Sequence, residues 1–274
     1  MFIMHPYLSP LAPEPTTPAI AIRNLTKVFG EHRAVDDLSM DVPRGSFYGV
    51  VGPNGAGKTT TITMATGLLR PTQGQAWIAG HPVWSDRDAS AQAKAAYGLL
   101  ADGLPVFDRL SAMEYLTYLG LLRGMDEATI SSRARGLLAA LDLPTDNKLI
   151  VDYSAGMTKK ILLAGAMLHR PEVLILDEPF EAVDPVSARH IRQLLHAYRD
   201  AGGTVVMSSH VMELVEGLCD HVAIIAQGQV LSAGTIDEVR QGRALDDVFV
   251  DLIGAGDLDD GALGWLGDMG AHRD

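Results

Sequence analysis

The run GPNGAGKT at residues 52–59 combines three glycines with a lysine and a threonine at a spacing suited to holding phosphate groups. It follows a short apolar stretch and opens the helix-like KTTTITMATGLL, which is the context that a phosphate-binding loop requires. The glycines allow tight turns and close backbone approach, so that N–H groups and the start of a helix can surround a phosphate. The competing interpretation is a chance match in a glycine-rich turn, and the flanking strand and helix argue against it.

Individual residues of this loop suggest distinct roles at a nucleotide. Lys58 is expected to reach the β- and γ-phosphates, Thr59 to place its hydroxyl on Mg²⁺, and Thr60 to donate to the α-phosphate. The predicted nucleotide contacts of the loop are Gly52, Pro53, Asn54, Gly55, Ala56, Gly57, Lys58, Thr59 and Thr60.

Two adjacent acids, Asp177 and Glu178, follow the apolar run Val173–Leu176. Ligands of open α/β sheets bind at the carboxyl ends of the strands, and two acids at that edge need a cation. Asp177 is predicted to hold Mg²⁺ through water, and Glu178 to orient and polarise the water that attacks the phosphate. Alone, the pair could merely cap a loop before Pro179, but the phosphate loop upstream favours a site.

The elements that must position these groups follow an α/β pattern, in which short β-branched runs alternate with helix-like segments. Residues 20–28 and 38–42 alternate like exposed antiparallel strands. Phe47–Val51, Val173–Leu176 and residues 204–208 are mainly apolar and do not alternate, which is typical of continuous buried strands. These buried runs are expected to form the central sheet.

A helical insertion interrupts this pattern between about residues 111 and 147. Ser111 with Glu114 forms a capping box, and leucines and other apolar residues follow at helical spacing. We expect a single domain over residues 19–253, with a helical subdomain at about 103–157.

The two ends of the sequence differ from the rest. Residues 1–18 contain several prolines and no basic residue, which predicts a disordered tail and not a signal peptide. Near the other end, Thr235 with Glu238 repeats the capping box, and residues 245–253 indicate a short closing helix. Residues 254–274 lack helix or strand periodicity, so a flexible C-terminal tail is expected.

Composition excludes several classes of protein. With 274 residues, 47% of them hydrophobic, the chain can bury one substantial core and a smaller one. A net charge of −12 argues against a nucleic-acid binder, because phosphate backbones are bound by clustered Lys and Arg. The single cysteine, Cys219, excludes an intrachain disulfide. No apolar run approaches the roughly 20 residues that span a bilayer.

Further motifs stand in a recognisable order. YSAGMTKK at residues 153–160 precedes the paired acids, and EAVD at residues 181–184 and then His210 follow them. In this order the motifs resemble the ATP-binding cassette (ABC) family, over about residues 20–233. Within that family, VFDRLSAMEYL and LDEPFEAVDPVSAR are similar to cassettes of the ABC-2 export group. The resemblance implies a P-loop NTPase core with an antiparallel β subdomain and an inserted helical subdomain, and ATP and Mg²⁺ as cofactors.

The resemblance also implies a head-to-tail dimer, in which each ATP lies between the phosphate loop of one subunit and the YSAGM segment of the other. Ser154 and Gly156 would face the γ-phosphate from the start of a helix expected over residues 158–169, although Ser154 could be an ordinary helix cap. Phe29 occupies the place of the family's adenine-stacking aromatic residue. It could instead be a core-facing strand residue.

Asp184 and His210 take two further places in the family pattern. Asp184 before Pro185 is a good helix cap in its own right, and the resemblance adds a contact to the ATP site across the dimer. His210 would contact the γ-phosphate and, with Glu178, hold the geometry of the attacking water, whereas an isolated histidine at a strand end is more often structural.

The chain departs from the family pattern at two positions. Met157 stands where the family has a glutamine, so the polar side chain of that position is absent. Asp102 aligns near the family's glutamine between the core and the helical lobe. A carboxylate there could bind Mg²⁺ directly or through water, or Asp102 could be a loop residue outside the site.

These observations predict an ATP-binding and ATP-hydrolysing subunit of an ABC transporter, of the ABC-2 export type. Its expected partners are a membrane-spanning permease and a second cassette subunit, without nucleic acid. It would lie at the cytoplasmic face of the cell membrane, held by the permease near residues 102–124. The alternatives are a soluble single-cassette ABC ATPase in cofactor assembly or repair, and a P-loop kinase, which leaves YSAGM and His210 unexplained.

Overall fold

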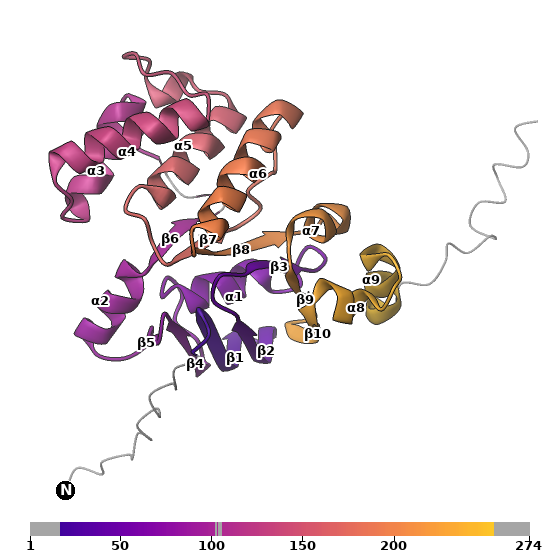
Figure 1. Cartoon of the computed structure of the whole chain (residues 1–274). Helices are drawn as coiled ribbons and strands as arrows, with labels where there is room; N and C mark the ends of the chain where they lie inside the picture. The colour runs from indigo at the N-terminus through magenta and orange to yellow at the C-terminus, as the bar shows by residue number, and fades with distance from the viewer. Residues whose placement is uncertain (1–16, 102, 104–105, 255–274) are drawn as a thin grey trace, which may run out of the picture.

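Figure 1 shows the computed structural model, in which two sheets lie together with helices packed around them. The structure describes residues 17–101, 103 and 106–254. The predicted tails at residues 1–18 and 254–274 lie almost entirely outside the described residues, and so does Asp102.

The central sheet has six strands in the order β10-β9-β3-β8-β7-β6. Its strands are β3 (Phe47–Val51), β6 (Tyr97–Leu100), β7 (Val173–Leu176), β8 (Thr204–Ser209), β9 (His221–Ala226) and β10 (Gln229–Thr235). The pairs from β9 to β6 are parallel, and β10 runs antiparallel to β9. Strands β3, β7 and β8 are buried along their whole length, which confirms the expectation of buried central strands.

The second sheet is antiparallel and has the order β2-β1-β4-β5. Its strands are β1 (Ile20–Phe29), β2 (His32–Val42), β4 (Gln73–Ile78) and β5 (His81–Pro82). Pairing of β1 with β2 runs from Ile20 opposite Val42 to Phe29 opposite His32, so the turn between them holds Phe29 and His32 at one end of this sheet. This sheet is the one that the alternating runs predicted.

Two hydrophobic cores lie on opposite faces of the central sheet. One fills the space between the two sheets around helix α1 (Lys58–Ala65) and contains Val50 and Ile62. The other lies beneath the helices on the far face and contains Val51 and Ile161. Because successive strand residues point to opposite faces, the neighbours Val50 and Val51 each complete a different core.

The helices gather mainly on that far face, as Figure 1 shows for α3, α4, α5 and α6. They are α2 (Arg87–Ala95), α3 (Ala112–Leu122), α4 (Glu127–Ala140), α5 (Ala155–Met167), α6 (Pro185–Asp200), α7 (Met212–Leu218), α8 (Ile236–Arg240) and α9 (Leu245–Ile253), with a short 3₁₀ helix at Ile150–Asp152. The capping boxes predicted at the starts of α3 and α8 are both present, and the closing helix predicted over residues 245–253 is α9.

The predicted helical insertion contains α3 and α4, which pack against α5. A β carbon on Gly165 of α5 would lie 2.7 Å from Leu119 Cδ1 of α3, so the glycine allows the two helices to approach closely. The boundaries at residues 103 and 157 stay a prediction.

Helix α5 begins three residues earlier than the sequence predicted. The Ser154 hydroxyl accepts a hydrogen bond from Met157 N at 3.3 Å, and this cap starts the helix at Ala155. The expectation that Gly156 precedes the helix was therefore wrong, because Gly156 lies in its first turn. The helix ends at Met167, two residues before the expected His169.

Candidate functional site

A cavity of about 520 Å³ lies where the phosphate loop meets the carboxyl ends of β7 and β8. Its lining residues are Phe29, His32, Ala34, Asn54, Gly55, Ala56, Gly57, Lys58, Thr59, Thr60, Asp177, Glu178, Glu181 and His210. The fold thus brings together residues far apart in the sequence, because parallel strands present their ends at a common edge.

The loop adopts a backbone that requires glycine. Gly55 and Gly57 have φ angles of 81° and 99°, in the left-handed region that other residues seldom adopt. A β carbon on Gly57 would also lie 2.6 Å from the Ala34 carbonyl oxygen of β2. The next residue, Lys58, begins α1, so the helix N-terminus points its free N–H groups toward the cavity.

Lys58 is held over the loop by backbone carbonyl groups. Its ammonium group donates to the Gly52 oxygen at 2.7 Å and to the Pro53 oxygen at 3.2 Å, and the residue is only 7% exposed. Burial lowers the pKa of Lys58 below its ordinary value, and the nearby Glu178 and Asp177 carboxylates oppose that change. Gly52 and Pro53 therefore position the lysine and do not themselves line the cavity.

Asp177 offers one free oxygen to the cavity. The residue is 1% exposed, and Ser208 Oγ donates a hydrogen bond to its Oδ1. Its Oδ2 is buried and has no hydrogen-bond partner within the described chain. A buried carboxylate oxygen without a donor is costly, and a bound cation would remove that cost. The donor set of Asp177 and the Thr59 hydroxyl, both lining the cavity, fits Mg²⁺.

Glu178 and His210 face each other across the cavity. His210 Nδ1 lies 3.1 Å from Glu178 Oε1. Glu178 has a φ of 47°, an unfavourable backbone conformation for a residue with a β carbon, and such strain occurs at functional sites. Glu178 N donates to Ser208 Oγ at 2.9 Å, so one hydroxyl of β8 holds both acids that follow β7.

Sequence reasoning did not identify Ser208. The residue is fully buried, and its role depends on the pairing of β7 with β8, across which its hydroxyl reaches both neighbouring acids. The two serines between the apolar residues 205–207 and His210 were the signal that could have found it. His32, Ala34 and Glu181 also line the cavity and were not predicted.

The remaining predicted residues fall into two groups. Phe29 is 48% exposed at the end of β1, with Lys27 Nζ 5.0 Å from its ring centre, so it is not a core-facing residue. Ser154, Gly156 and Asp184 lie outside the lining of the cavity.

Ser154 and Asp184 each cap a helix. Ser154 caps α5, and Asp184 caps α6 by accepting hydrogen bonds from Val186 N and Ser187 N, both at 3.0 Å. The hydrogen bonds from Ser187 lower the pKa of Asp184. These interactions account for both residues structurally and leave their faces available to another molecule.

A glycine-rich loop at a helix N-terminus, with a buried aspartate and a glutamate at the sheet edge, defines a nucleotide-hydrolysing P-loop protein. Comparison with known proteins narrows this class. The family model for ABC transporters matches residues 35–181. The chain therefore belongs to the ATP-binding cassette family and is an ABC transporter ATPase subunit, which binds and hydrolyses ATP.

Curated relatives are similar over most of their length. The linearmycin resistance ATP-binding protein LnrL of Bacillus subtilis is 35% identical over 77% of this chain and 68% of its own. The daunorubicin/doxorubicin resistance ATP-binding protein DrrA of Streptomyces peucetius is 36% identical over 82% of this chain and 67% of its own. The bacitracin transport ATP-binding protein BcrA of Bacillus licheniformis is 34% identical over 81% of this chain and 71% of its own.

Solved structures share the fold. An ATP-binding subunit of an ABC transporter superposes with a TM-score of 0.80 at 26% identity, covering 86% of this chain and 99% of that one. The dimeric cassette MJ0796, bound to ADP and Pi after hydrolysis, has a TM-score of 0.72 over 79% of this chain and 98% of that one. At 22% identity, the second likeness concerns the fold alone.

Proposed function

We propose that this subunit works as one half of a head-to-tail cassette dimer that powers export through a separate membrane-spanning permease. The observation that carries the dimer is the division of the predicted site. The phosphate loop, Asp177, Glu178 and His210 line one cavity, whereas Ser154 and Gly156 lie outside it at the start of α5. A helix start that does not face its own nucleotide can complete the site of a second copy or of a related cassette.

In this site, residues 52–60 hold the phosphates of ATP. Lys58 supplies a positive charge already directed by two carbonyl oxygens, and the N–H groups of the loop and of α1 surround the phosphates. Phe29 offers its exposed ring to the adenine. From the partner subunit, the residues equivalent to Ser154, Gly156 and Asp184 close the site from the other side.

Mg²⁺ is the metal that this site would hold. Thr59 and the free Oδ2 of Asp177 are its proposed ligands in the described chain. When bound, the ion neutralises negative charge on the phosphates as the bond to the leaving group breaks. Asp102 remains a proposed further ligand.

Hydrolysis depends on the positions of Glu178 and His210. The Glu178 carboxylate accepts a hydrogen bond from the attacking water, and this bond turns a lone pair of the water oxygen toward the γ-phosphate. His210, 3.1 Å from this carboxylate, limits its rotation and contacts the γ-phosphate. Ser208 is a positioning residue, because it fixes the Glu178 backbone and one oxygen of Asp177.

Export and attachment to a permease rest on the relatives, which include proteins named for drug resistance, bacitracin transport and Nod factor export. None of the helices described here is long and apolar enough to cross a bilayer. A separate permease would then hold the subunit at the cytoplasmic face of the membrane. The proposed contact surface is the helical lobe near residues 102–124.

The test is the variant Glu178→Gln in the purified full chain. Without the carboxylate, ATP turnover should fall by about 100-fold or more, and an ATP-bound dimer should accumulate on size-exclusion chromatography. Glu213→Gln is a matched control, because Glu213 is exposed on α7 and does not line the cavity. Unchanged turnover in Glu178→Gln would remove Glu178 from its role, and a monomer with ATP trapped would contradict the dimer.

A further inference from the structure

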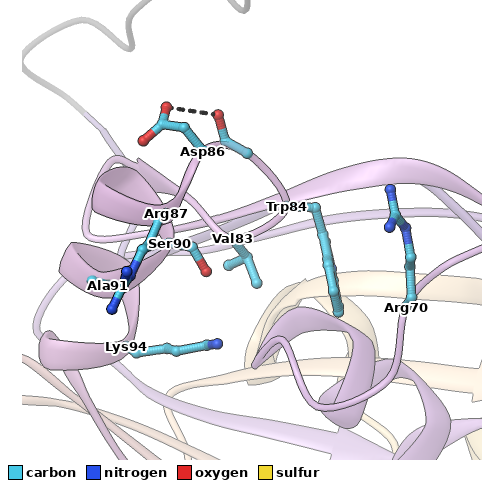
Figure 2. A pocket seen from close by; sticks show the side chains of 9 residues that line it. Arg70, Val83, Trp84, Asp86, Arg87, Ser90, Ala91 and Lys94 are labelled. Carbon is cyan, nitrogen blue, oxygen red and sulfur yellow. Dashed lines mark hydrogen bonds between the residues drawn. The ribbon is translucent and has the colours of Figure 1, made fainter.

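A second cavity, of about 410 Å³, shares no residue with the ATP cavity (Figure 2). It lies between α2 and the segments that follow α1 and β5. Its lining residues are Arg70, Val83, Trp84, Ser85, Asp86, Arg87, Ser90, Ala91 and Lys94. Three of these side chains are cations, although acids outnumber Lys and Arg by 34 to 22 in the sequence.

One face of α2 is directed at this cavity. Its contributions, Arg87, Ser90, Ala91 and Lys94, follow the i, i+3, i+4, i+7 spacing of a single helical face. Figure 2 shows these side chains along α2, with Trp84 and then Arg70 on the other side. The cationic residues of α2 are thus gathered toward the cavity by the helix itself.

In the opposite wall, two hydrogen bonds fix Trp84. Trp84 Nε1 donates to the Met64 oxygen at 2.8 Å, and its backbone oxygen accepts from Gln75 Nε2 at 2.9 Å. The stem of Lys94 passes over Gly67, where a β carbon would lie 3.3 Å from Lys94 Cε. The absence of a side chain at Gly67 leaves this path open, so that Lys94 can lie along the cavity wall.

The cations of this cavity form no ion pair with an acid in the part of the chain that is described. Neither an ion pair nor a hydrogen bond joins the side chain of Arg70, Arg87 or Lys94 to another residue there, whereas Arg23, Arg44 and others pair with acids. The one acid in the lining, Asp86, already accepts hydrogen bonds from Asp88 N and Ala89 N as the cap of α2.

Arg70, Arg87 and Lys94 are all exposed, so water and salt screen their mutual repulsion, and an anion bound among them would gain attraction from each of the three charges. Two guanidinium groups, an ammonium group and the Ser90 hydroxyl are all donors, and guanidinium groups match the oxygens of phosphate in pairs. A phosphate carries up to two charges on several oxygens, so it satisfies this set better than a single carboxylate. We infer that this cavity is a binding site for a phosphate group, carried by a lipid headgroup or by a soluble phosphorylated compound.

The test uses the full chain with its ATP cavity saturated by a non-hydrolysable ATP analogue, so that the phosphate loop is occupied. Two probes separate the sources: inorganic phosphate in calorimetry, and vesicles of phosphatidylcholine with and without phosphatidylglycerol in flotation. Arg87→Ala/Lys94→Ala removes two cavity cations. The matched control, Arg135→Ala/Arg170→Ala, removes two exposed cations that lie outside this cavity and outside residues 102–124.

The cavity variant should bind about 10- to 30-fold more weakly to whichever probe binds the wild type, since each cation near an anionic group contributes a factor of about five. The affinity of the control variant for the same probe should stay within about twofold of the wild type, because salt screens charges outside the cavity. Binding of phosphate without binding of vesicles assigns a soluble compound, and binding that requires phosphatidylglycerol assigns a lipid headgroup. The inference is overturned if neither probe binds, if both double variants lose affinity equally, or if acetate binds as tightly as phosphate.

Discussion

The variant Ser208→Ala tests whether one buried hydroxyl holds the hydrolytic centre together. Ser208 Oγ donates to Asp177 Oδ1 and accepts from Glu178 N at 2.9 Å, and the residue is fully buried. Its removal leaves a buried N–H group without an acceptor and frees the Asp177 carboxylate to rotate. Both consequences fall on residues that we place at the attacking water and the metal.

The expected magnitude follows from these two contacts. A hydrogen bond to a charged group contributes about 1.5–3 kcal/mol, and an unsatisfied buried donor costs about 1–3 kcal/mol. The free energy of unfolding should therefore fall by about 3 kcal/mol in Ser208→Ala. Without its anchor, the strained backbone of Glu178 can relax, and a displacement of about 1 Å at a reacting group lowers the rate by about 100-fold. Affinity for ATP should change little, because Lys58 and the phosphate loop keep their contacts.

The assay is ATP turnover as a function of ATP and then of Mg²⁺, with urea unfolding of the same samples. Ser208→Ala should lower kcat, leave KM within about threefold because ground-state binding is retained, and raise the Mg²⁺ concentration needed for half-maximal turnover. Ser209→Ala is the matched control, since the Ser209 hydroxyl accepts from Val211 N at 3.0 Å and has no hydrogen bond to Asp177 or Glu178 among the described residues. If folded Ser208→Ala has the turnover and Mg²⁺ dependence of this control, the positioning role is refuted.

Four further variants test the metal site, the helix packing and the pH dependence. Asp177→Asn should abolish Mg²⁺-dependent turnover, because an amide nitrogen would replace a ligand oxygen, and retained Mg²⁺ dependence would contradict the assignment. Gly98→Ala should lower the free energy of unfolding by more than about 2 kcal/mol, since the new β carbon would lie 2.0 Å from the Ala166 oxygen. A β carbon at Gly136 in α4 would meet nothing within 4 Å, so Gly136→Ala should raise the free energy of unfolding by about 0.5–1 kcal/mol in urea. Burial, followed by nearby guanidinium charge, lowers the pKa of His169 from 6.5 to about 4, so between these values the unfolded chain binds a proton that the folded chain does not. The free energy of unfolding should therefore fall by about 1 kcal/mol between about pH 7 and about pH 5, after allowance for partial exposure. His169→Gln should lose this part of the pH dependence in urea unfolding. Equal pH dependence of the variant and the wild type would contradict the assignment to His169.

Predictions from the sequence succeeded where a few neighbouring residues determine the structure. The capping boxes at Ser111 and Thr235 depend on side chains three residues apart, and both form as predicted. The phosphate loop likewise carries its own glycines, with the left-handed angles that such a turn requires. The roles of its residues at ATP stay predictions, because they concern a molecule outside the chain.

The sequence was less informative where strands or helices distant in the chain meet. Ser208 lies next to Asp177 only because β8 pairs with β7, and no local pattern fixes that register. The start of α5 was expected at residue 158, whereas the Ser154 cap starts the helix at Ala155 and outweighs the low helix propensity of Gly156. Helix α2 was missed because its face toward the second cavity is polar, so it lacks the apolar periodicity that identifies a helix.

The two halves of the proposed dimer site are joined within one subunit by a short, tightly packed segment. From Glu178 the chain passes in a few residues to Ala182, whose carbonyl oxygen lies against Gly156, 3.3 Å from where its β carbon would be. Lys160, buried on α5, donates to Ser187 Oγ of α6 at 3.3 Å. In the proposed dimer, α5 would offer its N-terminus to the partner's ATP. Because α5 contacts the segment that leaves Glu178, a shift of α5 on dimer closure would act on that segment. In that dimer, the packing of α5 against this segment would link the ATP held with the partner to the subunit's own Glu178.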